Sequence, residues 1–258
     1  MDAIVIAGGV PEPDESLYPY TQGNPKALLD IGGKPMVQWV LDALCSADTI
    51  NSVVIIGLAP DCGVSCEKAV SFLPDSGGIL QNIRAGVEQV LKLNPKAHHV
   101  AVVSADIPTI LPEHVDWVVN TAMLSDLDLY YNVISRETME KRFPGSNRTY
   151  IRLKDVQVCG GDLNIVRAMT VTGNDALWER IIASRKNAAK QAALLGLDTL
   201  LLLLIHQITL EGAIKRVTKR VGLTGRALLC PYAEIGMDVD KPHQLVLVRA
   251  DLEKGRVG

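Results

Sequence analysis

The first 35 residues constrain the fold most, because an apolar segment within them ends abruptly in two glycines. Residues 3–7 form an apolar run with the length of a buried strand, and Gly8 and Gly9 follow it directly. Glycine allows the backbone to turn sharply and allows a ligand to approach it closely. The pattern therefore predicts a buried strand, ending at Ala7, that leads into a loop accessible to phosphate.

A lysine stands at the far end of this loop. The loop covers residues 10–24 and ends in Pro25-Lys26, and the apolar segment 27–31 and the turn Gly33-Lys34-Pro35 come after it. No basic residue precedes Lys26 in the chain. A lysine ammonium acts as a point charge on phosphate oxygens, and Lys26 is the first candidate for that role. The alternative is a solvated lysine in a turn.

Strand-like and helix-like segments alternate through the rest of the chain, which is typical of α/β proteins. We expect a three-layer α/β/α sandwich around a mostly parallel, Rossmann-like sheet. Further strands are expected at 53–57, 69–73, 99–104, 127–135, 149–153, 163–166 and 226–231. Helices are expected at 36–45, 79–93, 112–123 and 243–252. Residues 136–147 read as an exposed loop, and Cys159-Gly160-Gly161 as a turn.

Residues 174–222 have a helical pattern throughout, and we interpret them as a helical insertion in a single domain that spans 1–258. Helices are expected there at 175–190, 191–205 and 209–221. A basic face on the last of these most simply indicates a solvated helix. The leucine run 200–204 is most simply core, with a homodimer contact as the alternative.

Composition excludes several classes of function. The 258 residues carry a formal net charge of −3, which gives no general attraction to nucleic acid. The longest apolar run is far shorter than the roughly 20 residues that span a membrane.

The five cysteines show neither a Cys-x-x-Cys pair nor zinc spacing, so reduced thiols are expected. With no signal-peptide pattern at the start, we expect a cytoplasmic protein.

Three aspartates indicate a metal site. Asp106 follows the strand at 99–104, and open α/β sheets bind their ligands at the carboxyl ends of strands. Asp238 and Asp240 lie in a second acidic segment far along the chain. Mg²⁺ is commonly held by one or two carboxylates together with substrate phosphates. We expect Asp106 and either Asp238 or Asp240 to bind Mg²⁺; turn or cap roles are the alternative.

Three segments carry a resemblance to a known family. Ala7-Gly8-Gly9, Pro25-Lys26-Ala27-Leu28 and Gly33-Lys34-Pro35 occur in the order and spacing seen in MobA-like nucleotidyltransferases. These enzymes have the nucleotide-diphospho-sugar transferase fold, which is related to the GT-A fold. Asp106-Ile107-Pro108 and Asp238 with Pro242 also resemble family motifs. The loop 10–24 differs, since the family usually has glycine and arginine there.

The resemblance implies a nucleotidyltransferase of the EC 2.7.7 type, with Lys26 and Asp106 as catalytic residues. Its substrates would be a nucleoside triphosphate and a small phosphorylated acceptor: a sugar phosphate, a pterin cofactor or an alcohol phosphate. The residues implied in nucleotide binding are Ala7, Gly8, Gly9, Lys26, Gly77, Gly78, Asn82 and Asp106. The segment with Gly161, Asp162 and Asn164 resembles the family's acceptor segment; a β-bulge is the alternative.

Two other functions stay open from the sequence. One is a GT-A-type glycosyltransferase that consumes a nucleotide-sugar, for which free nucleotide rather than pyrophosphate would be the product. The other is a non-catalytic nucleotide-binding regulatory module, which the atypical loop 10–24 supports. Arg148, Tyr150 and Arg152 alternate along one predicted strand. They either reach an acceptor phosphate or, more simply, form a polar strand edge.

Overall fold

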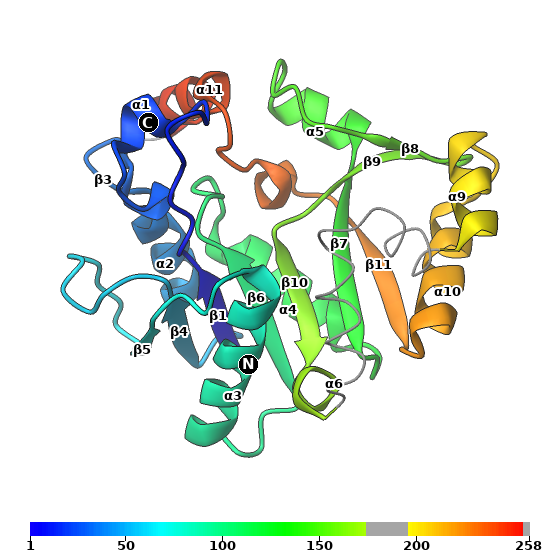
Figure 1. The fold of residues 1–258 in the computed structure, drawn as a ribbon, viewed down its shortest axis with the longest axis horizontal. Helices are drawn as coiled ribbons and strands as arrows, with labels where there is room; N and C mark the ends of the chain where they lie inside the picture. The colour runs from blue at the N-terminus through cyan, green and yellow to red at the C-terminus, as the bar shows by residue number, and fades with distance from the viewer. Residues whose placement is uncertain (174–195, 255–258) are drawn as a thin grey trace.

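A computed structural model describes residues 1–173 and 196–254. Its centre is a sheet with the strand order β5-β4-β1-β6-β10-β7-β9-β8, and β11 pairs with β7 (Figure 1). The strands are β1 Asp2–Ile6, β4 Ser52–Ile56, β5 Ala69–Leu73, β6 His99–Ser104, β7 Leu129–Ser135, β8 Ile151–Arg152, β9 Gln157–Gly160, β10 Leu163–Arg167 and β11 Gly225–Cys230. A separate two-stranded sheet pairs β2 Asp30–Ile31 with β3 Lys34–Pro35.

Most of the sheet is parallel. Strands β5, β4, β1 and β6 are neighbours and run in one direction. Strand β10 pairs antiparallel with both β6 and β7, so β7 and its parallel partner β11 return to the common direction. Because the central parallel strands end at the same edge, their following loops meet there.

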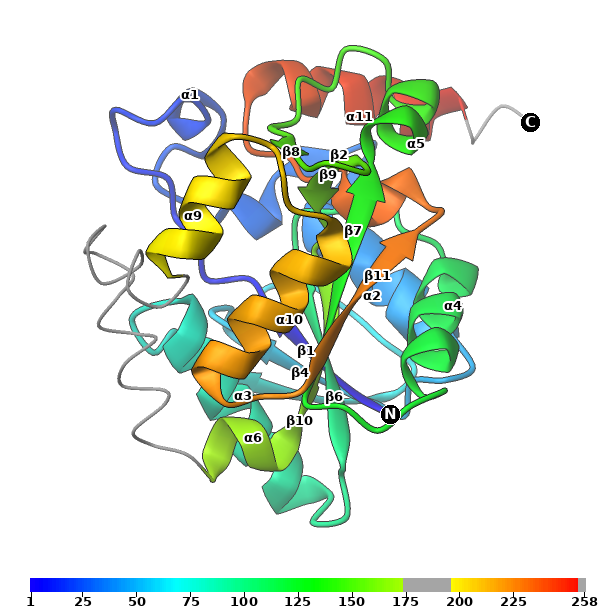
Figure 2. The same cartoon turned by 90° about the vertical axis from the view of Figure 1, so that its right-hand side faces the viewer.

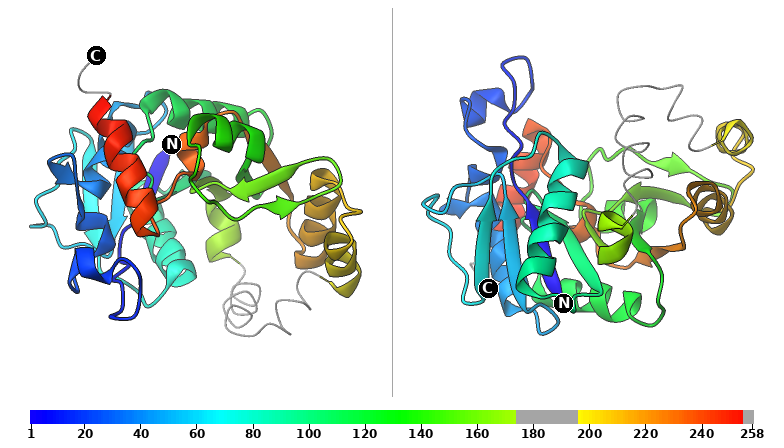
Figure 3. Two further views of the ribbon diagram at one scale, coloured as in Figure 1. Left: turned by 90° about the horizontal axis from the view of Figure 1, so that it is seen from above. Right: turned by 60° about the horizontal axis from the view of Figure 1, so that its bottom comes forward.

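Helices cover both faces of the sheet, as Figures 2 and 3 show. Helices α2 Met36–Ser46 and α4 Pro112–Ala122 pack on one face, and α3 Ile79–Leu93 and α6 Ala168–Thr172 on the other. Alternate residues of β1 therefore enter different cores: Ala3 and Val5 contact the first layer, and Ile4 the second. A strand buried on both faces needs a continuous apolar run, which explains residues 3–7. The expected three-layer sandwich is confirmed.

A helical hairpin covers the end of the sheet at β11. Its helices are α9 Leu197–Leu204 and α10 Leu210–Val221, and it lies far from β5 (Figures 1 and 3). Ile208 between these helices is buried with Val133 of β7 and Val158 of β9. Residues 175–190 and the start of 191–205 lie outside the described residues. The remaining short elements are α1 Tyr18–Thr21, η1 Lys26–Leu28, α5 Arg136–Arg142, η2 Ala233–Gly236 and α11 Pro242–Lys254.

Three local expectations were wrong. Residues 136–142 form helix α5, because the Ser135 side chain caps it by accepting a hydrogen bond from the Thr138 amide. Cys159 and Gly160 belong to strand β9, which pairs with β7. Cys45 and Cys66 form a disulfide, with Cα atoms 5.9 Å apart, although both were expected as thiols. Their closeness depends on how α2 packs against the loop after β4, which spacing along the chain does not reveal.

No helix within residues 1–173 or 196–254 has the length and apolar character needed to cross a bilayer.

Asp128, just before β7, connects the end of β10, helix α6 and the residue before β11. Its carboxylate accepts hydrogen bonds from the Thr224 amide at 2.7 Å, the Thr170 hydroxyl at 2.8 Å and Arg167 Nε at 2.9 Å. Burial acts to raise the pKa of Asp128, but these hydrogen bonds outweigh it and lower the pKa to about 2. The ionised form therefore stabilises the fold above the ordinary carboxyl pKa, and this contribution is lost as the pH falls toward 2.

We expect Asp128→Asn to lower the free energy of unfolding by about 1–2 kcal/mol at pH 7. The penalty should shrink to about half by pH 3, because the wild-type carboxylate then loses part of its advantage. Urea unfolding at the two pH values measures both effects. Asp61→Asn in an exposed loop serves as the control. A penalty that does not change with pH would contradict the role of the ionised carboxylate.

Candidate active site

A cavity of about 570 Å³ opens at the carboxyl ends of β1 and β6. Strand β1 ends beside β6, where Ile6 is in register with Ser104. Segments from four other parts of the chain complete the walls. The described residues that line it are Ile6, Ala7, Gly8, Gly9, Lys26, Ala27, Asp75, Gly77, Gly78, Ile79, Asn82, Ser104, Ala105, Asp106, Asp162, Asp238 and Asp240.

Backbone hydrogen bonds hold these distant segments together. The Lys26 amide donates to the Gly9 carbonyl at 2.8 Å, so the loop 10–24 returns to its own beginning. The Val239 amide donates to the Asp106 carbonyl at 3.0 Å, which places the second acidic segment beside the first. The Asp162 carbonyl accepts from the Ser104 amide at 2.8 Å. Main-chain contacts therefore position the carboxylates at the cavity.

Lys26 lies between two of the carboxylates. Its Nζ donates to Asp106 Oδ2 and to Asp240 Oδ1, each at 2.6 Å. Burial acts to lower the pKa of Lys26, but the charges and hydrogen bonds of both aspartates outweigh it and raise the pKa. The ammonium is thus charged at neutral pH. It is the only cation among the described residues that line the cavity.

Asp162 and Asp238 form a second acidic pair, on the side of the cavity toward Arg148. Asp238 is buried and forms an ion pair with Arg148, and Asp162 Oδ2 lies 3.9 Å from Arg148 Nη2. Burial, and secondly the charge of Asp106, raise the pKa of Asp162 to about 7. The sequence interpretation of Arg148 as a polar strand edge was wrong, since its side chain is only 14% exposed.

Another wall is formed by the glycines before α3. The Asn82 side chain is buried; its Oδ1 accepts from the Ser76 amide at 2.7 Å, and its Nδ2 donates to Asp75 Oδ1 at 2.6 Å. The Gly77 amide donates to Asp75 Oδ2 at 3.2 Å. Asn82 therefore supports this loop, and Asp75, which the sequence reasoning missed, presents a carboxylate to the cavity.

The structure brings most of the predicted site residues to one cavity, but not all of them. Gly161 and Asn164 are absent from the described lining. The Asn164 side chain donates to the Gly161 carbonyl at 2.9 Å and accepts from the Asn132 amide at 2.8 Å. Both residues shape the strand end that carries Asp162. Their predicted contact with an acceptor stays a prediction, as do the roles of the lining residues.

Gly57, which lies outside the cavity lining, supports the corner at Gly8. Gly57 has a φ of +94°, and a Cβ built on it would lie 2.1 Å from Gly8 Cα and 2.4 Å from Gly8 N. No side-chain rotation relieves a clash with backbone atoms. In the sequence Gly57 is only the end of an expected strand, because its contact with Gly8 joins the ends of two different strands.

Gly57→Ala should displace the Gly8 corner and lower the free energy of unfolding by about 3 kcal/mol or more, with loss of ligand binding at the cavity. Denaturant unfolding measures the stability. Gly63→Ala is the matched control: Gly63 has a φ of +80°, but a Cβ there would meet nothing within 4 Å. Equal penalties in the two variants would show that backbone strain alone matters.

The donor set suits a divalent cation. Asp106, Asp238 and Asp240 offer only oxygen ligands, which Mg²⁺ prefers. Asp106 Oδ1 is buried and has no hydrogen-bond partner in the described part of the chain. A buried carboxylate oxygen without a partner is costly unless a cation or donor meets it. The residues present therefore fit the metal that the sequence predicts.

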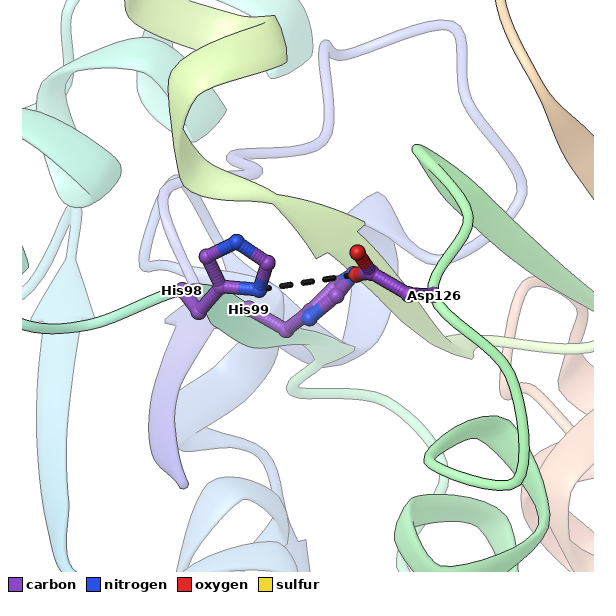
Figure 4. Close-up of side chains that lie close together, drawn as sticks. All are labelled: His98, His99 and Asp126. Atoms are coloured by element: carbon purple, nitrogen blue, oxygen red, sulfur yellow. Dashed lines mark ion pairs between the residues drawn. The ribbon is translucent and has the colours of Figure 1, made fainter.

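A second cluster of potential metal ligands lies at the opposite edge of the sheet (Figure 4). Asp126 Oδ1 is 3.6 Å from His98 Nδ1 and 3.9 Å from His99 Nε2. Arg167 already supplies a cation, since its Nη2 donates to Asp126 Oδ1 at 2.8 Å and its Nη1 lies 3.0 Å from His98 Nε2. His99 Nε2 also contacts the Leu127 carbonyl. This cluster is satisfied by its own neighbours.

The fold and the cavity, together with the sequence, show which class of protein this chain belongs to. A mostly parallel sheet carries a glycine corner, a lysine and aspartates that line one cavity at its strand ends. The sequence profile of the MobA-like NTP transferase domain matches residues 3–195. The chain belongs to this family, and the predicted family is confirmed. Membership supports transfer of a nucleotidyl group as the general activity.

Several solved structures have a fold similar to that of this chain. A hypothetical transferase from Thermus thermophilus is 34% identical over 95% of this chain and 98% of its own, with a TM-score of 0.82. CMP:2-keto-3-deoxy-manno-octonic acid synthetase, solved with CTP, is 15% identical over 98% and 99%, with a TM-score of 0.61. The Anaerococcus prevotii 4-diphosphocytidyl-2C-methyl-D-erythritol synthase is 12% identical over 98% and 95%, with a TM-score of 0.58. The last two show the fold alone. No curated protein matches the chain.

Proposed function

We propose that this protein is a Mg²⁺-dependent nucleotidyltransferase that joins a nucleoside triphosphate to a small phosphorylated acceptor. The observation that carries the proposal is Lys26, held between Asp106 and Asp240 beside the glycine corner. Family membership supports the reaction class.

In the proposed reaction an acceptor phosphate oxygen attacks the α-phosphorus of the nucleotide in line. The new P–O bond forms as the bond between the α-phosphorus and the bridging oxygen breaks, and pyrophosphate leaves with the electron pair. A phosphate nucleophile is already ionised and needs no general base. Catalysis then depends mainly on positioning and charge neutralisation.

The residues have distinct roles in this proposal. The backbone at Gly8 and Gly9 allows close approach of the phosphates, and the Lys26 ammonium neutralises them. Asp106 with Asp238 or Asp240 would hold Mg²⁺, which when bound supplies further charge neutralisation on the phosphates. The wall at Gly77 and Gly78 would face the nucleobase.

A thermal-shift panel of nucleoside triphosphates tests the proposal, because a ligand that binds only the native state raises its stability. We expect one nucleotide to stabilise the protein when Mg²⁺ is present, and CTP is tested first because one structural neighbour was solved with it. Pyrophosphate release is then measured with that nucleotide over phosphorylated acceptors. Stabilisation without turnover on any acceptor would favour the regulatory module, and no stabilisation by any nucleotide would refute nucleotide binding.

A further inference from the structure

Arg148 is a buried cation just behind the cavity wall. It lies between α5 and β8, and its Nη1 pairs with Asp238. Its Nη2 lies 3.5 Å from the Gly160 carbonyl and 3.9 Å from Asp162 Oδ2. Its Nε is buried, and within residues 1–173 and 196–254 it has no hydrogen-bond partner. A buried guanidinium has five N–H groups to satisfy, so Arg148 keeps donor capacity for a ligand.

The partner of Arg148 is also a candidate metal ligand. Asp238 cannot give its full charge to both a guanidinium and a divalent cation, and the two cations repel each other at short range. Binding of Mg²⁺ and nucleotide at Asp106, Asp238 and Asp240 would therefore weaken the ion pair between Arg148 and Asp238. The Arg148 side chain would then be available to another anion.

An acceptor phosphate needs such a cation. The described lining holds five aspartates and one lysine, and a nucleoside triphosphate adds further negative charge. Figure 1 shows that the chain between α5 and β8 reaches the upper edge of the sheet across from α1 and the end of β1. Arg148 lies against Asp162 and Asp238, whereas Lys26 contacts Asp106 and Asp240. A planar guanidinium suits phosphate, because it donates two parallel hydrogen bonds.

We propose that Arg148 binds the phosphate of the acceptor, a phosphomonoester, and that Mg²⁺ and nucleotide release it from Asp238 for this role. The inference rests on the proposed function and adds to it the residue that would hold the acceptor phosphate.

The test uses inorganic phosphate as the probe and thermal shift as the readout. Wild-type protein is saturated with MgCl₂ and a non-hydrolysable α,β-methylene analogue of the nucleotide that stabilises it. Added phosphate should then give a further, saturable rise in the unfolding temperature, and no such rise without the analogue. In Arg148→Met the shift caused by the analogue should persist, while the apparent Kd for phosphate rises at least about 10-fold.

Two variants complete the experiment. Arg148→Lys keeps the charge and should retain part of the phosphate response, and it replaces the Met variant if that one does not fold. Arg152→Met removes an exposed arginine from β8 and should respond like wild type. An unchanged phosphate response in Arg148→Met, a response independent of the analogue, or none in wild type would overturn the inference. If the analogue itself does not stabilise the wild type, the proposed function fails, and the inference fails with it.

Discussion

Asp106→Asn should lower the rate of pyrophosphate release by about 100-fold or more and leave the fold intact. Asp106 presents one oxygen to Lys26 and a second, buried oxygen without a partner in the described part of the protein. Asparagine has the same shape but no charge, and its amide nitrogen cannot bind a cation. The backbone bond from Val239 to the Asp106 carbonyl is kept, so the site should stay assembled.

The measurement is pyrophosphate release with the nucleotide and acceptor that the wild-type protein uses, together with urea unfolding. Asp126→Asn is the matched control, because Asp126 lies at the opposite edge of the sheet and is mostly exposed. It should keep wild-type turnover. Normal turnover by a folded Asp106→Asn protein would remove Asp106 from the site.

Lys26→Met should be nearly as severe, with kcat/KM for the nucleotide lowered by about 100-fold. The substitution removes the only cation among the described lining residues and leaves Asp106 and Asp240 facing the triphosphate without it. Because the two aspartates raise the pKa of Lys26, the lysine is charged throughout the neutral range. The loss should therefore be the same at pH 6.5 and pH 8.5.

Steady-state kinetics at the two pH values check this expectation, and Lys26→Arg should recover part of the activity because it restores the charge. Lys34→Met is the control. Lys34 lies in the adjacent turn, and its ion pair is with Asp42 on the surface. If Lys34→Met lost as much activity as Lys26→Met, the defect would lie in the turn and not in the cavity.

The arrangement of the central sheet could be predicted from local patterns. Strands β1, β4, β5 and β6 and helix α3 lie within a residue of their expected bounds. Strands β1, β4 and β6 are buried on both faces, so they are continuous apolar runs, and β5 is a short apolar run at the edge of the sheet. Residues 136–142 and 157–160 were misread, because a helix of seven residues and a strand of four residues carry weak periodicity.

Some residues of the candidate site could also be predicted from the sequence, and others could not. Gly8, Lys26 and Asp106 were predicted because each stands at a strand end or a loop end that the chain itself marks. Gly57 was not predicted, because it has no local signature, and the alternating pattern of Arg148, Tyr150 and Arg152 left two roles open for Arg148. Arg148 is identified by the carboxylates around it, and Gly57 by its contact with Gly8.

The sequence by itself determined the α/β class, the central strands and the chemical types of the residues that follow them, because hydrophobic burial and turn chemistry act over a few neighbouring positions. Only the tertiary structure decided which charges meet. The pairing of Lys26 with Asp106 and Asp240, and of Arg148 with Asp238, joins segments about 80 to 214 positions apart. Such contacts follow from strand order and backbone hydrogen bonding between distant segments, which local periodicity does not encode.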